Sequence, residues 1–227
     1  SKKAKKEKWN IHAMITNDIS GNSYSSETRL HDNTRLRVFS EGVPVAETKE
    51  EEQLRKETFS ENDSKARQFA RYIKELGERY VEQYEVVMVY RHDRFLRGGD
   101  HLPFSQEGYT AVRITEMNEN YDQQHQDVRT ENETEYGDLE KHIDYEYLRK
   151  NTAVNLAAIA SLASSPAQPE NVRVLASKLT NKTNLQWEAP KKGKKPAGYY
   201  VLMRETTATT WTKKFFVKEK EITLPYS

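Results

Sequence analysis

Two segments of the sequence end in residues that could bind a metal ion. The segment ITND places Asp18 directly after a β-branched run, and the segment RIT is followed by Glu116 and a polar loop that contains His125. In an open sheet with parallel strands, side chains beyond the carboxyl ends of neighbouring strands meet in one crevice. A carboxylate and an imidazole suit Zn²⁺, although a catalytic zinc ion takes about three protein ligands. The alternative is that His125 is a loop residue that is hydrogen-bonded to Asp122 or Asp127.

The segment GGDHLPF contains a second group of residues with possible chemistry. Its two glycines allow the backbone to approach a ligand closely, and Asp100 with His101 could orient a ligand or a neighbouring side chain. The simpler interpretation, which this segment alone favours, is that Asp100 caps a short helix and that His101 has no role in a site.

The hydrophobic patterns around these segments predict strands that alternate with helices. β-Branched or alternating runs predict four strands, at residues 9–18, 35–39, 84–90 and 109–115. Apolar residues spaced by three and four predict an amphipathic helix from Ala66 to Leu76, with Gly77 near its end, and a second, longer helix begins at Asp144. Residues 41–60 are expected to form a charged surface segment. This order predicts an α/β domain with a mainly parallel sheet that is covered by helices.

The composition of the chain changes after a proline-containing linker at residues 164–170. Five short strand-like runs follow, separated by turn signals and without a helical pattern. Such a series is typical of a small all-β module. We therefore expect two domains, one at residues 1–165 and one at residues 166–227.

Charge and composition limit the classes of partner. The 227 residues include 36 Lys and Arg and 35 Asp and Glu, so the formal net charge is +1 and no global field favours nucleic acid or an anionic membrane. No apolar run approaches the ~20 residues that would span a bilayer. The chain has no cysteine, so any metal ligands must be His, Asp or Glu.

Four segments match a known family in order: NDISGN, FLRGGDHLPFSQEGYTAVRITE, ENYDQQHQDVR and IDYEYLRKNTAVNLAAIASLA. With them, residues 9–166 resemble the C-terminal half of the two-zinc aminopeptidases, a zinc exopeptidase family that also contains the glutaminyl cyclases. The resemblance implies a three-layer α/β/α sheet domain, incomplete in this chain. The later segments LQW and GYYVLMR, with Trp211, resemble a fibronectin type III domain, which implies a small all-β sandwich, also incomplete.

The resemblance implies that Asp18 is a ligand of one zinc ion and that His125 is a ligand of the other. Two zinc ions would polarise the peptide carbonyl and lower the pKa of a bridging water, which a glutamate general base would deprotonate. In the matching loop, the context QHQD differs from the His-Thr form that is commoner in the family, but the histidine is kept.

The resemblance implies supporting roles for four other residues. Asp100 and His101 would line the site behind the metal ligands. Glu116 and Tyr121 would contact the substrate or its amino terminus.

The family's other ligands and its general base have no counterpart in this chain. They lie upstream, in a His-x-Asp segment, a bridging Asp and a Glu-Glu pair. The acidic run at residues 50–52 follows Asp18 and is interpreted as solvated surface. We therefore expect a fragment, processed or trimmed before Ser1, with two of the five ligands. Alone, it should hydrolyse nothing and bind zinc weakly.

The predicted function is that of a zinc-dependent metallo-exopeptidase, an aminopeptidase that removes amino-terminal residues from a peptide substrate. One alternative is a catalytically inactive peptidase-like scaffold that binds peptides or cell-surface partners. Another is a glutaminyl cyclase-like enzyme, which uses one zinc ion. No nucleic-acid partner and no membrane span are expected. The fibronectin-like module and the lack of cysteine predict an extracytoplasmic location, secreted or periplasmic.

Overall fold

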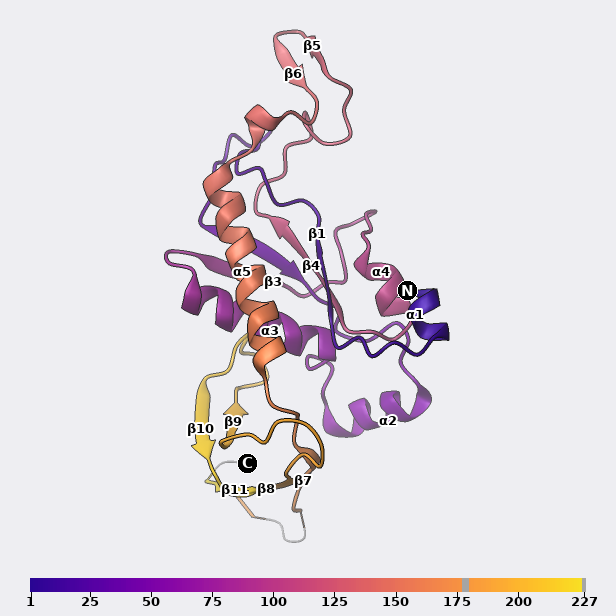
Figure 1. The fold of residues 1–227 in the computed structure, drawn as a ribbon, viewed down its shortest axis with the longest axis vertical. Helices are drawn as coiled ribbons and strands as arrows, with labels where there is room; N and C mark the ends of the chain where they lie inside the picture. The colour runs from indigo at the N-terminus through magenta and orange to yellow at the C-terminus, as the bar shows by residue number, and fades with distance from the viewer. Residues whose placement is uncertain (177–179, 226–227) are drawn as a thin grey trace. The chain divides into compact units, whose positions relative to one another are not determined.

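A four-stranded sheet in the order β1-β4-β2-β3 forms the centre of the first part of the chain in the computed structural model (Figure 1). Its strands are β1 (Met14–Asn17), β2 (Arg35–Phe39), β3 (Glu85–Val89) and β4 (Ala111–Glu116). β1 pairs with β4 and β2 pairs with β3 in parallel, whereas β2 and β4 are antiparallel. The sheet is therefore mixed, and the prediction of a mainly parallel sheet is confirmed only in part.

The structure describes residues 1–176 and 180–225, and the chain divides into two units, Ser1–Ile159 and Ala160–Ser227. All four predicted strands are present in the first unit, but the first one is shorter than expected. It pairs with β4 only from Met14 onward, where Met14 N donates to Thr110 O at 2.9 Å. Residues 9–13 pair with no strand among the residues that the structure describes.

Two long helices, α3 (Lys65–Tyr80) and α5 (Tyr145–Ser164), cover one face of this sheet. The predicted apolar stripe of α3 is buried, and α5 adds side chains to the same core. The core residues from the two helices are Phe69, Ala70, Ile73, Leu76, Tyr147, Val154 and Ala158. They pack against β2, β3 and β4, because alternate residues of a strand point to the same face.

Gly77 lies inside α3 rather than at its end, because the helix continues to Tyr80. A Cβ atom at Gly77 would lie 2.8 Å from Val86 Cγ2 and 3.2 Å from Val154 Cγ1. The glycine therefore allows α3 to approach β3 and α5 closely.

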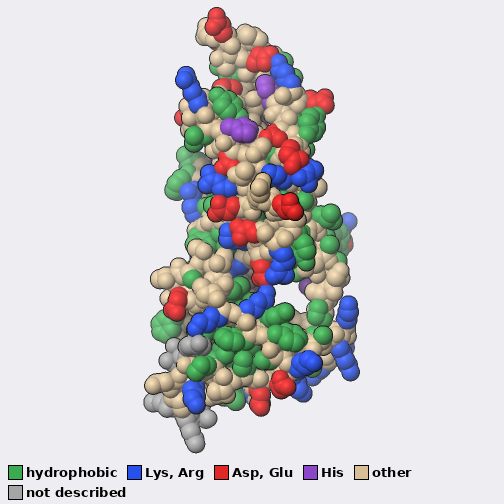
Figure 2. All heavy atoms as spheres, turned by 90° about the vertical axis from the view of Figure 1, so that its left-hand side faces the viewer, with side chains coloured by type: hydrophobic (Ala, Val, Ile, Leu, Met, Phe, Trp, Pro, Cys, Tyr) green, Lys and Arg blue, Asp and Glu red, His purple; other side chains and the backbone are tan. Residues whose placement is uncertain are grey.

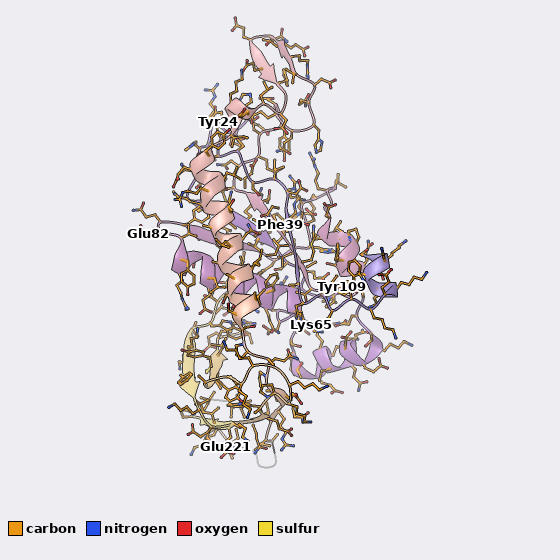
Figure 3. All side chains as sticks on the ribbon, viewed as in Figure 1. Tyr24, Phe39, Lys65, Glu82, Tyr109 and Glu221 are labelled. Atoms are coloured by element: carbon orange, nitrogen blue, oxygen red, sulfur yellow. The ribbon has the colours of Figure 1, made fainter. Side chains whose placement is uncertain are left out.

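The opposite face of the sheet is the one to which Arg113 points, because Val112 and Ile114 point into the core. The short helix α4 (His101–Gln106), which the sequence predicted, packs against β1 and β4. Figure 3 shows Tyr109, just after α4, beside α1 (Lys2–Lys6), where Lys5 Nζ lies 5.7 Å from the Tyr109 ring centroid. A three-layer arrangement stays a prediction.

Residues 41–60, which were expected to form a charged surface segment, contain the exposed helix α2 (Lys49–Thr58), which was not predicted. It has a capping box, in which the Thr48 side chain accepts from Glu51 N and the Glu51 carboxylate accepts from Thr48 N. None of its residues is buried, so it has no stripe of buried apolar residues that could have predicted a helix. Two further elements were not predicted, namely the hairpin of β5 (Arg129–Glu131) and β6 (Thr134–Tyr136) and the 3-10 helix η1 (Glu140–His142).

The second unit contains two small antiparallel sheets, in the orders β11-β8-β7 and β10-β9. All five predicted strands are present: β7 (Glu170–Val174), β8 (Thr183–Glu188), β9 (Tyr199–Met203), β10 (Lys213–Val217) and β11 (Glu221–Leu224). Trp187 is buried and meets the Tyr199 ring edge-on, with 5.3 Å between the ring centroids. The fibronectin type III assignment stays a prediction.

Among the described residues, no helix has the length and apolar character needed to cross a bilayer. Figure 2 shows Lys and Arg side chains interspersed with Asp and Glu side chains over the face that it draws.

Candidate metal centre

The parallel pairing of β1 and β4 brings two acidic residues to one edge of the sheet. The pair is in register from Met14 with Ala111 to Asn17 with Ile114, so both strands end at the same edge. Asp18 N donates to Ile114 O at 3.0 Å, and Glu116 N donates to Ile19 O at 2.8 Å. These backbone bonds continue the ladder just past β1 and hold Asp18 beside the end of β4.

The Asp18 carboxylate forms an ion pair with Arg113, whose side chain is fully buried. Arg113 Nη2 lies 3.0 Å from Asp18 Oδ2, and Arg113 Nε donates to the Asp18 carbonyl oxygen at 2.8 Å. Arg113 Nη1 also donates to Asp93 Oδ1 at 2.6 Å. The Asp18 side chain is 41% exposed, so one side of this carboxylate faces the buried arginine while the rest stays accessible.

His101 extends this buried network away from the cavity. Its Nε2 donates to His92 O at 2.9 Å and lies 3.4 Å from Asp93 Oδ2. Burial lowers the pKa of His101 below its ordinary value, so the neutral ring is favoured. A Cβ atom at Gly99 would lie 3.1 Å from His101 Nδ1 and 3.4 Å from Asp18 Oδ2, which explains why a glycine separates these two side chains.

Asp100 is at the N-cap position of α4, but its side chain makes no capping hydrogen bond. It is exposed and does not line the cavity that contains Asp18.

The loop after β4 carries His125 without an internal partner for its imidazole. Asp122, one of the two partners considered from the sequence, is hydrogen-bonded to Ser26 instead. No hydrogen bond or ion pair of the His125 ring occurs among residues 1–176 and 180–225, and the residue is exposed, with φ at 53°. Histidine tolerates this left-handed region better than most residues do. The interpretation of His125 as a hydrogen-bonded loop residue is therefore not supported.

Asp18, Glu116 and His125 line one cavity of about 290 Å³. Two other possible metal ligands line this cavity, Asp138 and His142, and neither was identified from the sequence. The Nε2 atom of His142 is buried and has no hydrogen-bond partner among the described residues. The segment GDLEKHID, with its Asp and His four positions apart just before α5, could have indicated them.

The donor set suits zinc by its chemistry, but it is not a complete site. Carboxylate and imidazole are common zinc ligands. Within the described part of the chain, however, no three His, Asp or Glu side chains are grouped in a way that could hold a metal ion. The cavity therefore contains candidate donors, and a closed coordination shell would need others.

Glu116 is the most perturbed acid in this cavity. It is completely buried, and burial raises the pKa of Glu116 to about 7 from 4.5. Its Oε2 accepts a hydrogen bond from Asn22 N at 2.9 Å, which opposes part of that shift. Tyr121, by contrast, lies outside this cavity and lines a neighbouring one.

Comparison with known proteins gives a consistent set of relatives. The chain is homologous to fungal proteins named as probable zinc metalloproteases. It is 43% identical to one from Leptosphaeria maculans over 219 residues, which are 96% of this chain and 50% of that protein. It is 44% identical to one from Pyricularia oryzae over 214 residues, covering 92% of this chain and 42% of the relative.

A third relative, from Pyrenophora teres f. teres, is 41% identical over 221 residues, or 96% of this chain and 45% of that protein. The chain thus spans about half the length of the curated relatives it matches. No protein-family model matches the chain, and no solved structure matches it. The chain is thus homologous to about half of each of these proteins, which are named as probable zinc metalloproteases.

Proposed function

We propose that the cavity lined by Asp18, Glu116 and His125 is part of the active site of a zinc-dependent aminopeptidase. The observation that carries the proposal is that Asp18 and an unpartnered His125 line one cavity, at the edge where the parallel strands β1 and β4 end. Homology to proteins named as probable zinc metalloproteases supports both the metal and a peptide substrate. The removal of amino-terminal residues and the use of two zinc ions rest on the family resemblance in the sequence.

In this proposal, Asp18 and His125 each hold one zinc ion. Zinc bound there would polarise a peptide carbonyl and lower the pKa of a coordinated water. Asp138 and His142, which line the same cavity, are candidates for further ligands. Arg113 fixes the Asp18 carboxylate, and Asp93 with His101 supports Arg113 from the interior.

Glu116 lines the same cavity. With a pKa of about 7, it can exchange a proton near neutral pH. We propose that it faces the amino terminus of the peptide, whose amine is itself cationic over the same pH range.

Zinc titration of the 227-residue chain tests the metal part of this proposal. We expect weak binding, and a loss of affinity of at least about tenfold at one ion in D18N and at the other in H125Q, because each variant removes the donor that the proposal assigns to that ion. H12Q is the matched control, since His12 is exposed and its ring is hydrogen-bonded to the exposed Asn10. Stoichiometric, tight zinc binding by the wild-type chain, or unchanged affinity in both variants, would contradict the proposal.

The reaction is tested in a protein of the relatives' length that contains this chain. An aminopeptidase releases nitroaniline from an aminoacyl-nitroanilide, whereas a glutaminyl cyclase converts an N-terminal glutaminyl peptide into a product with a blocked end. Loss of nitroaniline release in D18N and H125Q, with retention in H12Q, supports the aminopeptidase. A zinc-free protein that binds peptides but cleaves none supports an inactive scaffold instead.

A further inference from the structure

A second cavity, of about 490 Å³, lies next to the candidate metal centre. The segment 116–121 contributes to both, because Glu116 and Asn120 line the first cavity whereas Glu119 and Tyr121 line the second. Arg94 lines the second cavity and is close enough to Asp18 for the two charges to interact. The two cavities are therefore close to each other at the end of β4.

The lining of the second cavity is rich in cationic side chains. Four arginines contribute to it, namely Arg37, Arg91, Arg94 and Arg97. They lie around the end of β2, where Figure 3 labels the buried Phe39 that forms part of the wall. Two carboxylates line the cavity as well, Glu27 and Glu119.

Two of the four arginines share one carboxylate. Arg37 Nη2 lies 2.9 Å from Glu119 Oε1, and Arg94 Nη1 pairs with Glu119 Oε2. The Glu119 side chain is only 4% exposed. Arg94 Nε also lies 4.0 Å from Asp93 Oδ1. The four arginines of the lining face two glutamates, so positive charge is in excess among the lining residues. Burial lowers the pKa of Arg94 from its ordinary value.

The other two arginines have no carboxylate partner within 4.0 Å among the residues that the structure describes. Each is instead placed over an aromatic ring, with Arg91 Cζ 3.7 Å from the Phe95 centroid and Arg97 Cζ 5.6 Å from the Tyr121 centroid. Such cation–π contacts restrict the guanidinium without using its N–H donors. Phe95 is 82% exposed, so this side of the cavity is open to solvent.

We propose that this arginine cavity binds a carboxylate of the peptide, downstream of the amino-terminal residue held in the first cavity. A guanidinium matches a carboxylate with two parallel hydrogen bonds, and Arg91 and Arg97 offer unused donors beside an excess of positive charge. The carboxylate is either an acidic side chain or the terminal carboxylate of a short peptide. The inference rests on the proposed aminopeptidase function for the direction of the peptide, but the carboxylate binding itself can be measured without metal or catalysis.

The test is a titration of the isotope-labelled 227-residue chain with four tripeptide probes, followed by NMR. The probes are Ala-Ala-Glu-amide, Ala-Ala-Gln-amide, Ala-Ala-Gln with a free carboxyl terminus, and Ala-Ala-Glu with both carboxylates. We expect Ala-Ala-Gln-amide to bind at least about tenfold more weakly than the probes with a carboxylate in the preferred position, because it lacks the charge-assisted contact. Preference for Ala-Ala-Glu-amide identifies an acidic side chain, and preference for Ala-Ala-Gln identifies the terminal carboxylate.

The variants R91Q and R97Q locate the site. Each is expected to lower the affinity for the preferred probe by about tenfold. The control R79Q changes an exposed arginine of α3 that pairs with Glu75, and it should leave this affinity unchanged. Equal affinity for all four probes, or full affinity in both R91Q and R97Q, would overturn the proposal. D18N and H125Q keep the carboxylate preference even if they abolish zinc binding, so failure of the zinc proposal is distinguishable from failure of this one.

Discussion

Arg113 contacts both the carboxylate and the backbone carbonyl of Asp18. Its Nη2 is 3.0 Å from Asp18 Oδ2, and its Nε donates to the Asp18 carbonyl oxygen at 2.8 Å. The same guanidinium pairs with Asp93 at 2.6 Å, and its side chain has no exposed surface. The orientation of Asp18 at the end of β1 is therefore set by a buried ion-pair network within the chain.

Removing the arginine should destabilise the fold as well as release Asp18. In R113M, the buried Asp93 loses the cation at 2.6 Å and keeps the more distant Arg94 Nε at 4.0 Å, and breaking a buried pair costs about 3–5 kcal/mol. Urea unfolding measures the loss. R149M is the control, because Arg149 pairs with Glu146 on an exposed part of α5, where we expect a change of at most about 1 kcal/mol. A loss in R113M no larger than that of R149M would contradict a structural role for this network.

Glu116 should make stability depend on pH in the direction opposite to that of most carboxylates. Its folded pKa of about 7 lies above the ordinary value of 4.5, so the folded chain binds more protons between these two pH values. The stabilising effect of this group is complete below about pH 4.5 and is lost as the pH rises through about 7. The shift corresponds to at most about 3 kcal/mol.

The variant E116Q removes this titration. We expect the free energy of unfolding of E116Q to fall less than that of the wild type between pH 4.5 and pH 8, in urea titrations at several pH values. E82Q serves as the matched control, since Glu82 is exposed at the position labelled in Figure 3. If the free energy of unfolding has the same pH dependence in the wild type, E116Q and E82Q, the pKa of Glu116 is not raised in the folded chain.

A methyl group at Gly77 should cost stability although it improves the helix. Alanine has a higher helix propensity than glycine by about 1 kcal/mol. The added Cβ would, however, lie 2.8 Å from Cγ2 of the completely buried Val86, and overpacking a core typically costs 1–3 kcal/mol. We expect G77A to be less stable than the wild type by about 1 kcal/mol in chemical unfolding.

The double variant G77A/V86A distinguishes a clash from a backbone effect. Because V86A removes the atom that the new Cβ meets, the two changes should not be additive, and G77A should cost less in the V86A background. Additive losses would show that the helix tolerates the methyl group and that the cost arises elsewhere.

The elements with a strong burial pattern could be predicted from the sequence. The dense β-branched run at residues 84–90 forms β3, and the apolar spacing from Ala66 to Leu76 forms the buried face of α3. α2 buries nothing, so it had no such pattern, although the spacing of Thr48 and Glu51 in its capping box was a usable local signal. The antiparallel pairing of β2 with β4 could not be predicted, because strand direction in a sheet follows from tertiary connections rather than from periodicity.

The candidate site was predictable where it depends on strand ends. Asp18, Glu116 and His125 were placed together because they follow the ends of strands that were expected to be parallel, and β1 and β4 are parallel. The role of Arg113 was missed, because alternation along β4 shows only which face it points to, while its partner Asp93 comes from a separate loop. The positions of Asp100 and Tyr121 outside the first cavity depend on loop conformations that residue types alone do not specify.

The pairing of β1 with β4 also has a consequence for the order of folding. The hydrogen bond from Asn22 N to the Glu116 carboxylate joins positions 94 residues apart, so a long loop must close for the two strand ends to meet. Closing such a long loop costs entropy before the contact contributes any stability, and contacts of high sequence separation slow folding. A partly folded chain with its helices formed and β1 unpaired would therefore lack the cavity altogether, and competence to bind metal would appear only with the completed sheet.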